Sequence, residues 1–351
     1  MISKLACRRM AALFVLTFAL ALRAQAAPEK GKRVWPIPDW AVSTPEAEGM
    51  SSEKLEALKT YFETHKSRAA LVIRHGKIVA EWYWDGKDKD STFQAYSVTK
   101  SLSSTAIGLL VKDGKVKLEQ SASDFIPEWK SDDRKEITVR HLISMDSGLA
   151  NQDGGIFMHN EQLKLSVALP AAHKPATVWN YNNGACNTLS QIITKAAGKE
   201  MGEFLEQRLY KPLGITHAKM DRNSDQTLAY MGLNINARDL AKVGYLFLNK
   251  GQWKGKRILP ECWILQATTA SQELNKAYGF LWWVRTYTEN PKLPKDSYQA
   301  IGLYGNYLSV MPSQDLIVVR LIGTAMNLAN SDVDGDAFAQ MALDAIKEPA
   351  P

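Results

Sequence analysis

The sequence of 351 residues lacks the motifs on which several large classes of enzyme depend. It has no Gly-x-Ser-x-Gly, which excludes the nucleophile elbow of α/β-hydrolases, and no Gly-Lys-Ser/Thr phosphate loop. Its six histidines are scattered, without His-Glu-x-x-His or the spacing of zinc ligands. The sequence therefore indicates neither a phosphate-loop nucleotide site nor a zinc site, and we expect no metal or organic cofactor.

One acidic string partly matches a calcium-binding loop. Asn330, Asp332, Asp334 and Gly335 follow the start of an EF-hand loop, but the glutamate required at the twelfth position is Met341. Acidic residues are also favoured in the first turn of a helix, where they face the positive end of the helix dipole. We interpret these residues as a solvated helix start.

The sequence has little excess positive charge outside its first residues. The formal net charge of +6 falls to +2 (6 − 4) without Lys4, Arg8, Arg9 and Arg23. Such a balance favours neither nucleic acid nor an anionic membrane surface as a partner.

Three of those four basic residues precede a short apolar run, residues 11–22, which small residues follow at Ala24 and Ala26. This order is typical of a secretory signal peptide, so we expect residues 1–26 to be removed and the mature chain to begin at Ala27. An N-terminal anchor helix is the alternative, but the run is short for a bilayer span. We expect a periplasmic or secreted protein without a stable membrane anchor.

Cysteine is scarce, with two residues, Cys186 and Cys262, outside the expected signal peptide. Export permits a disulfide between them. Two small buried thiols are the simpler alternative, and both interpretations stay open.

Strand patterns occur near both ends of the chain and helical patterns lie between them. Two alternating runs around His75-Gly76 predict a hairpin, and four strand-like runs follow Tyr278. From about 97 to 250 the pattern is mostly helical. We therefore predict an α+β fold, with an antiparallel sheet assembled from both termini and an inserted helical subdomain, in a single domain over residues 27–351.

Ser-x-x-Lys occurs twice, in different surroundings. Ser51 and Lys54 lie at the start of a polar surface helix, where the serine is explained as a cap. Ser97 and Lys100 begin a run with no further charge until Lys112, which indicates a buried helix. Positions i and i+3 share a helix face, so Ser97 and Lys100 can touch. A buried lysine can act as a base toward the serine, whereas the alternative is a lysine that snorkels out of the core.

Two further stretches add candidate groups. Tyr181 and Asn183 form Tyr-x-Asn before an apolar helix, where the tyrosine could relay a proton and the asparagine could hold substrate or Lys100. A loop tyrosine with asparagine caps is the alternative. The glycine-flanked run 301–311 could place a backbone N–H beside that of Ser97 as an oxyanion hole, or could be a plain bulge.

Taken together, these motifs resemble those of the β-lactamase-related serine hydrolases, a family that includes class C β-lactamases, DD-peptidases, family VIII carboxylesterases and 6-aminohexanoate-dimer hydrolase. The matching residues are Ser97-Val98-Thr99-Lys100, Tyr181-Asn182-Asn183 and a strand Leu303-Tyr304-Gly305-Asn306. The resemblance implies a β-lactamase-like sandwich, with Ser97 as nucleophile, Lys100 as base and Tyr181 as proton relay. It also implies that His141 is structural.

The chain departs from the family pattern on the closing strand. Penicillin-recognising members have Lys-Thr-Gly there, and we align Leu303-Tyr304-Gly305 with it, so the cation is missing. This departure favours the esterase and amide-hydrolase branch. Several aromatic residues are candidates for a pocket or simply for the core: Trp179, Trp282, Trp283, Tyr304 and Tyr307.

The sequence thus predicts an exported serine hydrolase that cleaves a small ester or amide through an acyl-enzyme on Ser97. The oxyanion would lie between the N–H groups of Ser97 and Asn306, and Leu303, Tyr304, Gly305 and Asn183 would contact substrate. A β-lactamase or DD-peptidase is the alternative, and a non-catalytic binding protein on the same fold is another.

Overall fold

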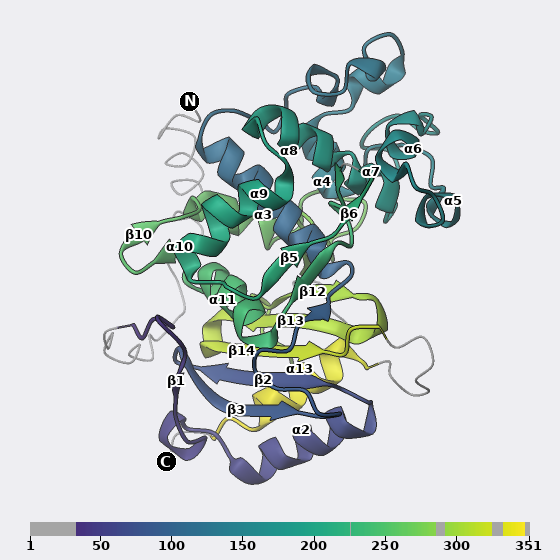
Figure 1. Cartoon of the computed structure of the whole chain (residues 1–351). Helices are drawn as coiled ribbons and strands as arrows, with labels where there is room; N and C mark the ends of the chain where they lie inside the picture. Colours follow the sequence, from purple (N-terminus) through teal and green to yellow (C-terminus); the bar gives the residue numbers. More distant parts are fainter. Residues whose placement is uncertain (1–32, 225, 286–291, 325–332, 348–351) are drawn as a thin grey trace, which may run out of the picture.

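The computed structural model describes residues 33–224, 226–285, 292–324 and 333–347 (Figure 1). The expected signal peptide, residues 1–26, lies outside the described residues, as do Asn330 and Asp332 of the acidic string. Asp334 caps the closing helix by accepting a hydrogen bond from the Asp336 N–H at 2.8 Å. The part of the acidic string that is described therefore starts a helix.

A seven-stranded sheet joins the two ends of the chain. Its strand order is β1-β3-β2-β14-β13-β12-β11. The N-terminal strand β2 pairs directly with the C-terminal strand β14, blue-purple beside yellow-green in Figure 1. The strands are β1 (Ala41–Val42), β2 (Ala69–Arg74), β3 (Lys77–Tyr83), β11 (Trp283–Val284), β12 (Tyr298–Gly302), β13 (Asn306–Met311) and β14 (Leu316–Leu321).

The sheet is antiparallel except at one edge. The predicted hairpin turns at His75-Gly76 between β2 and β3, and both turn residues have positive φ angles. At the outer edge, β1 pairs with β3 in parallel, whereas the other neighbouring strands of this sheet pair in the antiparallel way that the sequence predicted. The two-residue β1 comes from the extended lead-in, which reaches the sheet without the long crossover that parallel neighbours usually need.

Side chains alternate between two helical layers. Alternate residues of β14, such as Ile317 and Val319, enter the larger core beneath α3 (Val98–Lys112) and α11 (Ala237–Leu248). The intervening residues, such as Leu316 and Val318, pack with α2 (Ser52–Thr64) and α13 (Gly335–Asp344). The sheet is therefore buried on both faces, and α3 lies on the face opposite α2 and α13.

Helix α11 packs directly against the sheet, although it lies within the predicted helical subdomain. A Cβ atom on Gly244 would overlap the side chain of Leu308 in β13, so this glycine sets the close approach. The other helices are α4 (Val139–Ser144), α5 (Asp153–Phe157), α6 (Gln162–Ala168), α7 (Asn183–Asn187), α8 (Leu189–Ala197), α9 (Met201–Leu205), α10 (Lys211–Leu213) and α12 (Glu261–Ala267), with a π-helical turn at Glu206–Tyr210. Short 3₁₀ turns cover Glu46–Glu48, Ala122–Asp124, Pro127–Trp129, Asp133–Glu136, Leu303–Gly305 and Pro312–Gln314.

The helical region also contains three small sheets. A three-stranded sheet has the order β4-β8-β5, and two hairpins are formed by β6–β7 and β9–β10. Their bounds are β4 (Phe93–Gln94), β5 (Ala218–Met220), β6 (Arg222–Asn223), β7 (Gln226–Thr227), β8 (Leu233–Ile235), β9 (Gln252–Trp253) and β10 (Lys256–Arg257). Strand β4 leads straight into α3, so this sheet anchors the chain just before Ser97.

Of the cysteines in the described ranges, Cys186 is buried and Cys262 is half-buried, and they do not form a disulfide with each other. None of the helices that the described ranges contain combines the length and the apolar character that crossing a bilayer requires.

Candidate active site

Ser97 is the residue that begins helix α3. It occupies the N-cap position, and its side chain does not cap the helix. The preceding residue, Tyr96, has a left-handed backbone with φ of 49°, a conformation that is costly for a residue other than glycine. The chain therefore turns sharply into the helix and leaves Ser97 half-buried rather than enclosed.

Lys100 lies one turn further along α3 and points back at Ser97. Its Nζ atom is 2.8 Å from the Ser97 Oγ, and the residue is only 1% exposed. The same Nζ atom also donates to the carbonyl oxygen of Tyr230 at 3.0 Å. In the described part of the chain, no carboxylate forms an ion pair with it. The predicted Ser97–Lys100 contact is thus present, on a buried lysine.

The second Ser-x-x-Lys pair has the surface role that the sequence indicated. The Ser51 side chain accepts a hydrogen bond from the backbone N–H of Lys54 and caps α2. The Lys54 Nζ donates instead to the Asp344 carbonyl in an exposed setting, 2.6 Å away. Ser51 and Lys54 therefore form no catalytic pair.

Tyr181 comes from a loop before α7 and reaches Lys100. The Nζ of Lys100 lies 4.8 Å from the centre of the Tyr181 ring. Asn182 fixes the loop: its side chain caps α7 and donates to the carbonyls of Leu149 and Ala150, each at 3.1 Å. Asn183 begins α7 and is 9% exposed. The structure thus brings the three residues of the predicted set, Ser97, Lys100 and Tyr181, together.

Aromatic rings support Tyr181 from the side. Trp283 stacks on it with ring centres 5.8 Å apart and 24° between the planes. The buried Tyr278 meets both rings edge-on, and Trp179 packs against Tyr278 and Trp283. Two other pocket candidates lie elsewhere: Trp282 is fully buried against Phe247 and Tyr298, and Tyr307 packs with Phe338 on the opposite face.

The expected strand Leu303–Asn306 is in fact mostly a turn. Strand β12 ends at Gly302, which pairs with Asn306, and Leu303–Gly305 form the three-residue connection to β13. Left-handed angles at Tyr304 (φ 64°) and Gly305 (φ 79°) reverse the chain. The prediction that Leu303–Gly305 belong to a strand was therefore wrong. The uncharged residues that end the strand are Ala300-Ile301-Gly302.

Gly302 brings the end of β12 against the start of α3. A Cβ atom at this position would overlap the carbonyl oxygen of Ala95, two residues before Ser97. Asn306 is fully buried, and its side chain ties the turn to the end of β14 through Leu303, Ile322 and Gly323. The glycines of this stretch predicted a close approach of the backbone to a substrate. The structure shows instead a close approach of Gly302 to the backbone just before Ser97.

Two backbone N–H groups remain available at this junction. Within the described ranges, neither the N–H of Ser97 nor that of Leu303 donates to a protein acceptor. The Leu303 residue is 56% exposed, whereas Asn306 is completely enclosed. A substrate oxygen can therefore reach Leu303 more easily than Asn306.

Sequence reasoning missed two residues near the site. Tyr230 accepts from Lys100 through its carbonyl, and its ring centre lies 5.5 Å from the Lys100 Nζ; nothing in its local sequence indicates this role. Asp146 is 4% exposed, and burial raises the pKa of its carboxyl to about 6. It lies beside Met145, whose carbonyl accepts from the Asn180 N–H at 2.8 Å. His141 completes a capping box with Thr138, which agrees with a structural role.

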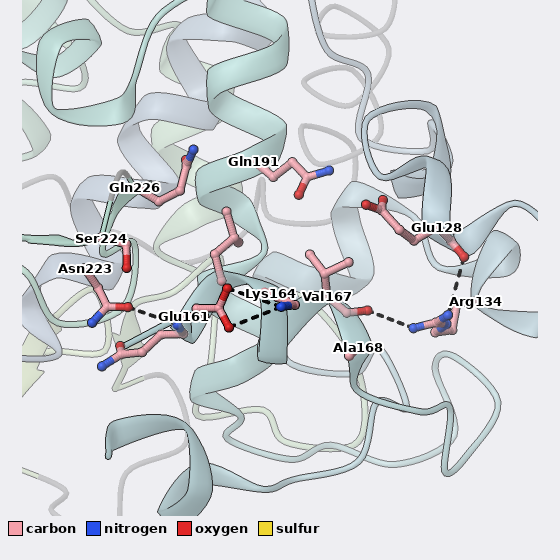
Figure 2. A pocket seen from close by; sticks show the side chains of 12 residues that line it. Glu128, Arg134, Glu161, Lys164, Val167, Ala168, Gln191, Asn223, Ser224 and Gln226 are labelled. Atoms are coloured by element: carbon pink, nitrogen blue, oxygen red, sulfur yellow. Dashed lines mark hydrogen bonds and ion pairs between the residues drawn. The ribbon is translucent and has the colours of Figure 1, made fainter. Parts of the chain in front are cut away.

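A separate cavity of about 650 Å³ lies between α6, α8 and the β6–β7 hairpin (Figure 2). Glu161 and Lys164 form an ion pair in its wall, as Figure 2 shows, and Arg134 pairs with Asp132. Ser97, Lys100 and Tyr181 do not line this cavity. One wall residue, Gln162, accepts a hydrogen bond from the Tyr230 hydroxyl at 2.8 Å. In the described ranges, no three His, Cys, Asp or Glu side chains converge as metal ligands would.

Comparison with known proteins agrees with this arrangement. The Beta-lactamase family profile matches residues 61–340. The 6-aminohexanoate-dimer hydrolase of Paenarthrobacter ureafaciens is 23% identical over 316 residues, covering 76% of this chain and 75% of that protein.

Solved structures give the same result for the fold. A Bacillus anthracis protein provisionally named 6-aminohexanoate-dimer hydrolase superposes with a TM-score of 0.74 at 20% identity, over 89% of this chain and 88% of its own. A penicillin-binding protein from Bacillus halodurans superposes with a TM-score of 0.64 at 18% identity, over 82% of this chain and 98% of its own. The predicted α+β, β-lactamase-like fold is confirmed.

Proposed function

Because the chain belongs to the Beta-lactamase family, whose profile spans most of it, we propose that it is a serine hydrolase that cleaves ester or amide bonds through an acyl-enzyme on Ser97. The observation that carries this proposal is the 2.8 Å contact between the Ser97 Oγ and the Nζ of a lysine that is 1% exposed. A nucleophile within hydrogen-bond reach of a base is the arrangement that activates a serine.

The reaction follows from the positions of three side chains. Lys100, in its amine form, takes the proton of the Ser97 hydroxyl as the Oγ bonds to the substrate carbonyl carbon. The proton then passes to the leaving alcohol or amine by way of Tyr181, whose ring lies against the Lys100 Nζ. The carbon–heteroatom bond breaks and leaves an acyl-serine. Water, activated by the same groups in reverse, releases the acid.

The N–H groups of Ser97 and Leu303 would stabilise the oxyanion. Both lack a protein acceptor in the described ranges, and Gly302 brings them to one junction. From the sequence alone, the second donor was expected to be the N–H of Asn306. We now favour Leu303, because an oxyanion donor must be accessible to a substrate carbonyl and Asn306 is fully buried.

The surroundings of the site favour substrates that lack a carboxylate beside the scissile bond. The strand end Ala300-Ile301-Gly302 carries no cation, and Leu303 presents exposed apolar surface next to it. An unpaired carboxylate placed there would lose hydration without gaining a partner. We therefore rank an esterase or amidase above a β-lactamase or DD-peptidase.

We also propose that the protein is exported, on the strength of the signal-peptide pattern in residues 1–26. N-terminal sequencing of the periplasmic or secreted fraction should begin at Ala27. Material there that retains Met1 would contradict this proposal.

Hydrolysis of p-nitrophenyl esters by Lys100→Ala and Lys54→Ala tests the proposed chemistry. Lys100→Ala should lose roughly 10³-fold or more in kcat, because residues that act as one unit fail together. Lys54→Ala, in the other Ser-x-x-Lys pair, should hydrolyse like the wild type. Absence of hydrolysis by the wild type across a panel of esters and amides would favour a non-catalytic binding protein.

A further inference from the structure

Arg320 is a fully buried arginine on β14, and it is not among the residues that contact Ser97. By the alternation of the strand it points toward the layer of α2 and α13, away from α3. Its Nη1 donates to the carbonyls of Tyr304 at 2.9 Å and Gly305 at 2.6 Å. Its Nη2 and Nε bind the His65 carbonyl at 2.6 Å and the Ser67 hydroxyl at 2.8 Å.

Two of these acceptors belong to the turn that carries the Leu303 N–H. The turn between Gly302 and Asn306 has four peptide groups. Arg320 holds the carbonyls of two of them, and the side chain of Asn306 holds the carbonyl of Leu303 at 2.7 Å. The remaining peptide group carries the Leu303 N–H. Hydrogen bonds hold the carbonyls of the three peptide groups that follow it. The orientation of the peptide group that carries the Leu303 N–H is therefore fixed as well.

The turn is also shaped to receive the guanidinium. A Cβ atom on Gly305 would overlap the Nη1 of Arg320, so the absence of a side chain there makes room for the contact. Tyr304 keeps a left-handed backbone despite being a non-glycine residue, which the surrounding contacts must stabilise. Its ring meets that of Tyr96, the residue before Ser97, edge-on at 5.4 Å.

We propose that Arg320 is a positioning residue for the reaction, which holds the Leu303–Gly305 turn so that the Leu303 N–H faces the oxyanion formed on Ser97. This inference rests on the proposed function. A lysine cannot take over the role, because its single ammonium cannot reach four acceptors arranged around a planar guanidinium. Loosening the turn should weaken transition-state stabilisation more than substrate binding.

Three readouts on Arg320→Lys test the inference: kcat and KM for p-nitrophenyl esters, the inhibition constant of phenylboronic acid, and the Tm. The boronate adduct on the serine carries an oxygen at the oxyanion position, so it reports that site directly. We expect kcat to fall about tenfold or more, the boronate to bind weaker by a similar factor, and KM to change less than about threefold, since removing one oxyanion donor outright costs roughly 10²–10³ in kcat.

Arg74→Lys is the matched control. Arg74 lies on the same face of the sheet and donates to a backbone carbonyl, that of Gly49, at 3.0 Å, but it does not touch the turn. It should leave kcat and boronate binding within about twofold of the wild type, whatever its effect on the Tm, because its contacts end at a distant loop. A folded Arg320→Lys that lowers only the Tm, with kcat and boronate binding unchanged, would overturn the proposal.

Ser67→Ala serves if Arg320→Lys does not fold. It removes one anchor of the guanidinium and keeps the arginine. We expect the same pattern at a smaller size, about threefold or more in kcat and boronate binding, and an unchanged pattern would contradict the inference. Labelling by a fluorophosphonate separates the two proposals: a wild type that is not labelled refutes the serine hydrolase, whereas a labelled wild type with an unaltered Arg320→Lys refutes the role of Arg320 alone.

Discussion

The ring of Tyr181 lies against the amino group of Lys100, with the Nζ 4.8 Å from the ring centre. One residue comes from the first turn of α3 and the other from a loop more than eighty positions later in the sequence. Trp283, on a third segment, stacks against the same tyrosine ring. The contact therefore depends on the whole fold, and it places a phenol beside the proposed base.

Tyr181→Phe should keep the fold and slow catalysis by roughly 10²-fold, the usual size of a general acid–base contribution. The ring stays in its stack on Trp283, so the Tm should change little. Amides should suffer more than p-nitrophenyl esters, because an amine needs a proton in order to leave and nitrophenolate does not. Rates with both substrates decide the matter, and normal amide turnover by Tyr181→Phe would remove the tyrosine from the mechanism.

Gly302→Ala should damage the site and the packing together. The added methyl would overlap the Ala95 carbonyl and push β12 away from the start of α3. Since misplacing reacting groups by about 1 Å can cost 10²-fold, we expect kcat to fall by about that factor, with a lower Tm. Gly155→Ala is the control, because a methyl there meets open space. Equal activity in the two variants would show that the close approach at Gly302 has no catalytic consequence.

Asp146 should make the stability depend on pH. Burial raises the pKa of its carboxyl to about 6, so the folded state binds this proton more tightly than the unfolded chain. That stabilisation is complete below the ordinary aspartate pKa and is lost as the pH rises through about 6. Asp146→Asn removes the titration, so its Tm relative to the wild type should rise between pH 4 and pH 8.

The expected size of that change is about 1–2 kcal/mol after allowance for solvent screening. It corresponds to a few degrees in Tm for a domain of this size. Thermal unfolding at both pH values measures it. A Tm difference between variant and wild type that stays constant over the range would show that Asp146 does not titrate there.

Leu303→Lys should shift substrate preference toward compounds with a carboxylate, such as nitrocefin. A charge-assisted contact contributes about 1.5–3 kcal/mol, and the exposed position of Leu303 places the effect near the lower end, about tenfold in relative kcat/KM. The wild type should prefer p-nitrophenyl esters to nitrocefin. Leu274→Lys controls for charge alone, since Leu274 is also exposed, at 48%.

A wide preference of the wild type for nitrocefin would contradict the assignment of substrate class. If instead Leu303→Lys leaves the nitrocefin-to-ester ratio unchanged, Leu303 does not face the part of the site that receives the carboxylate.

Local patterns were sufficient for the elements whose signals are short-range. The turn at His75-Gly76 and the cap at Ser51 follow from neighbouring residues. The Ser97–Lys100 contact follows from helix geometry, since residues three apart share a face. Tyr181 could be included only because the whole set resembles a known family, since no spacing rule connects it with Lys100.

The missed features depend on tertiary contacts. Tyr304 adopts a left-handed backbone, a conformation that a tyrosine in the sequence does not predict. Residues 303–305 were therefore predicted as strand, although they form a turn. Trp282 and Trp283 are neighbours in sequence, yet one fills the core and the other stacks on Tyr181. The Tyr230 carbonyl binds Lys100 as a backbone group, and any residue type would supply it.

Covalent labelling of Ser97 tests the central claim most directly. The wild type, Ser97→Ala and Ser51→Ala are each treated with a fluorophosphonate probe, and the modified peptide is located by mass spectrometry, with circular dichroism confirming that all three are folded. We predict stoichiometric labelling of wild type and Ser51→Ala on the peptide that contains Ser97, and none in Ser97→Ala. Labelling that persists in a folded Ser97→Ala, or that falls equally in both variants, would contradict the account.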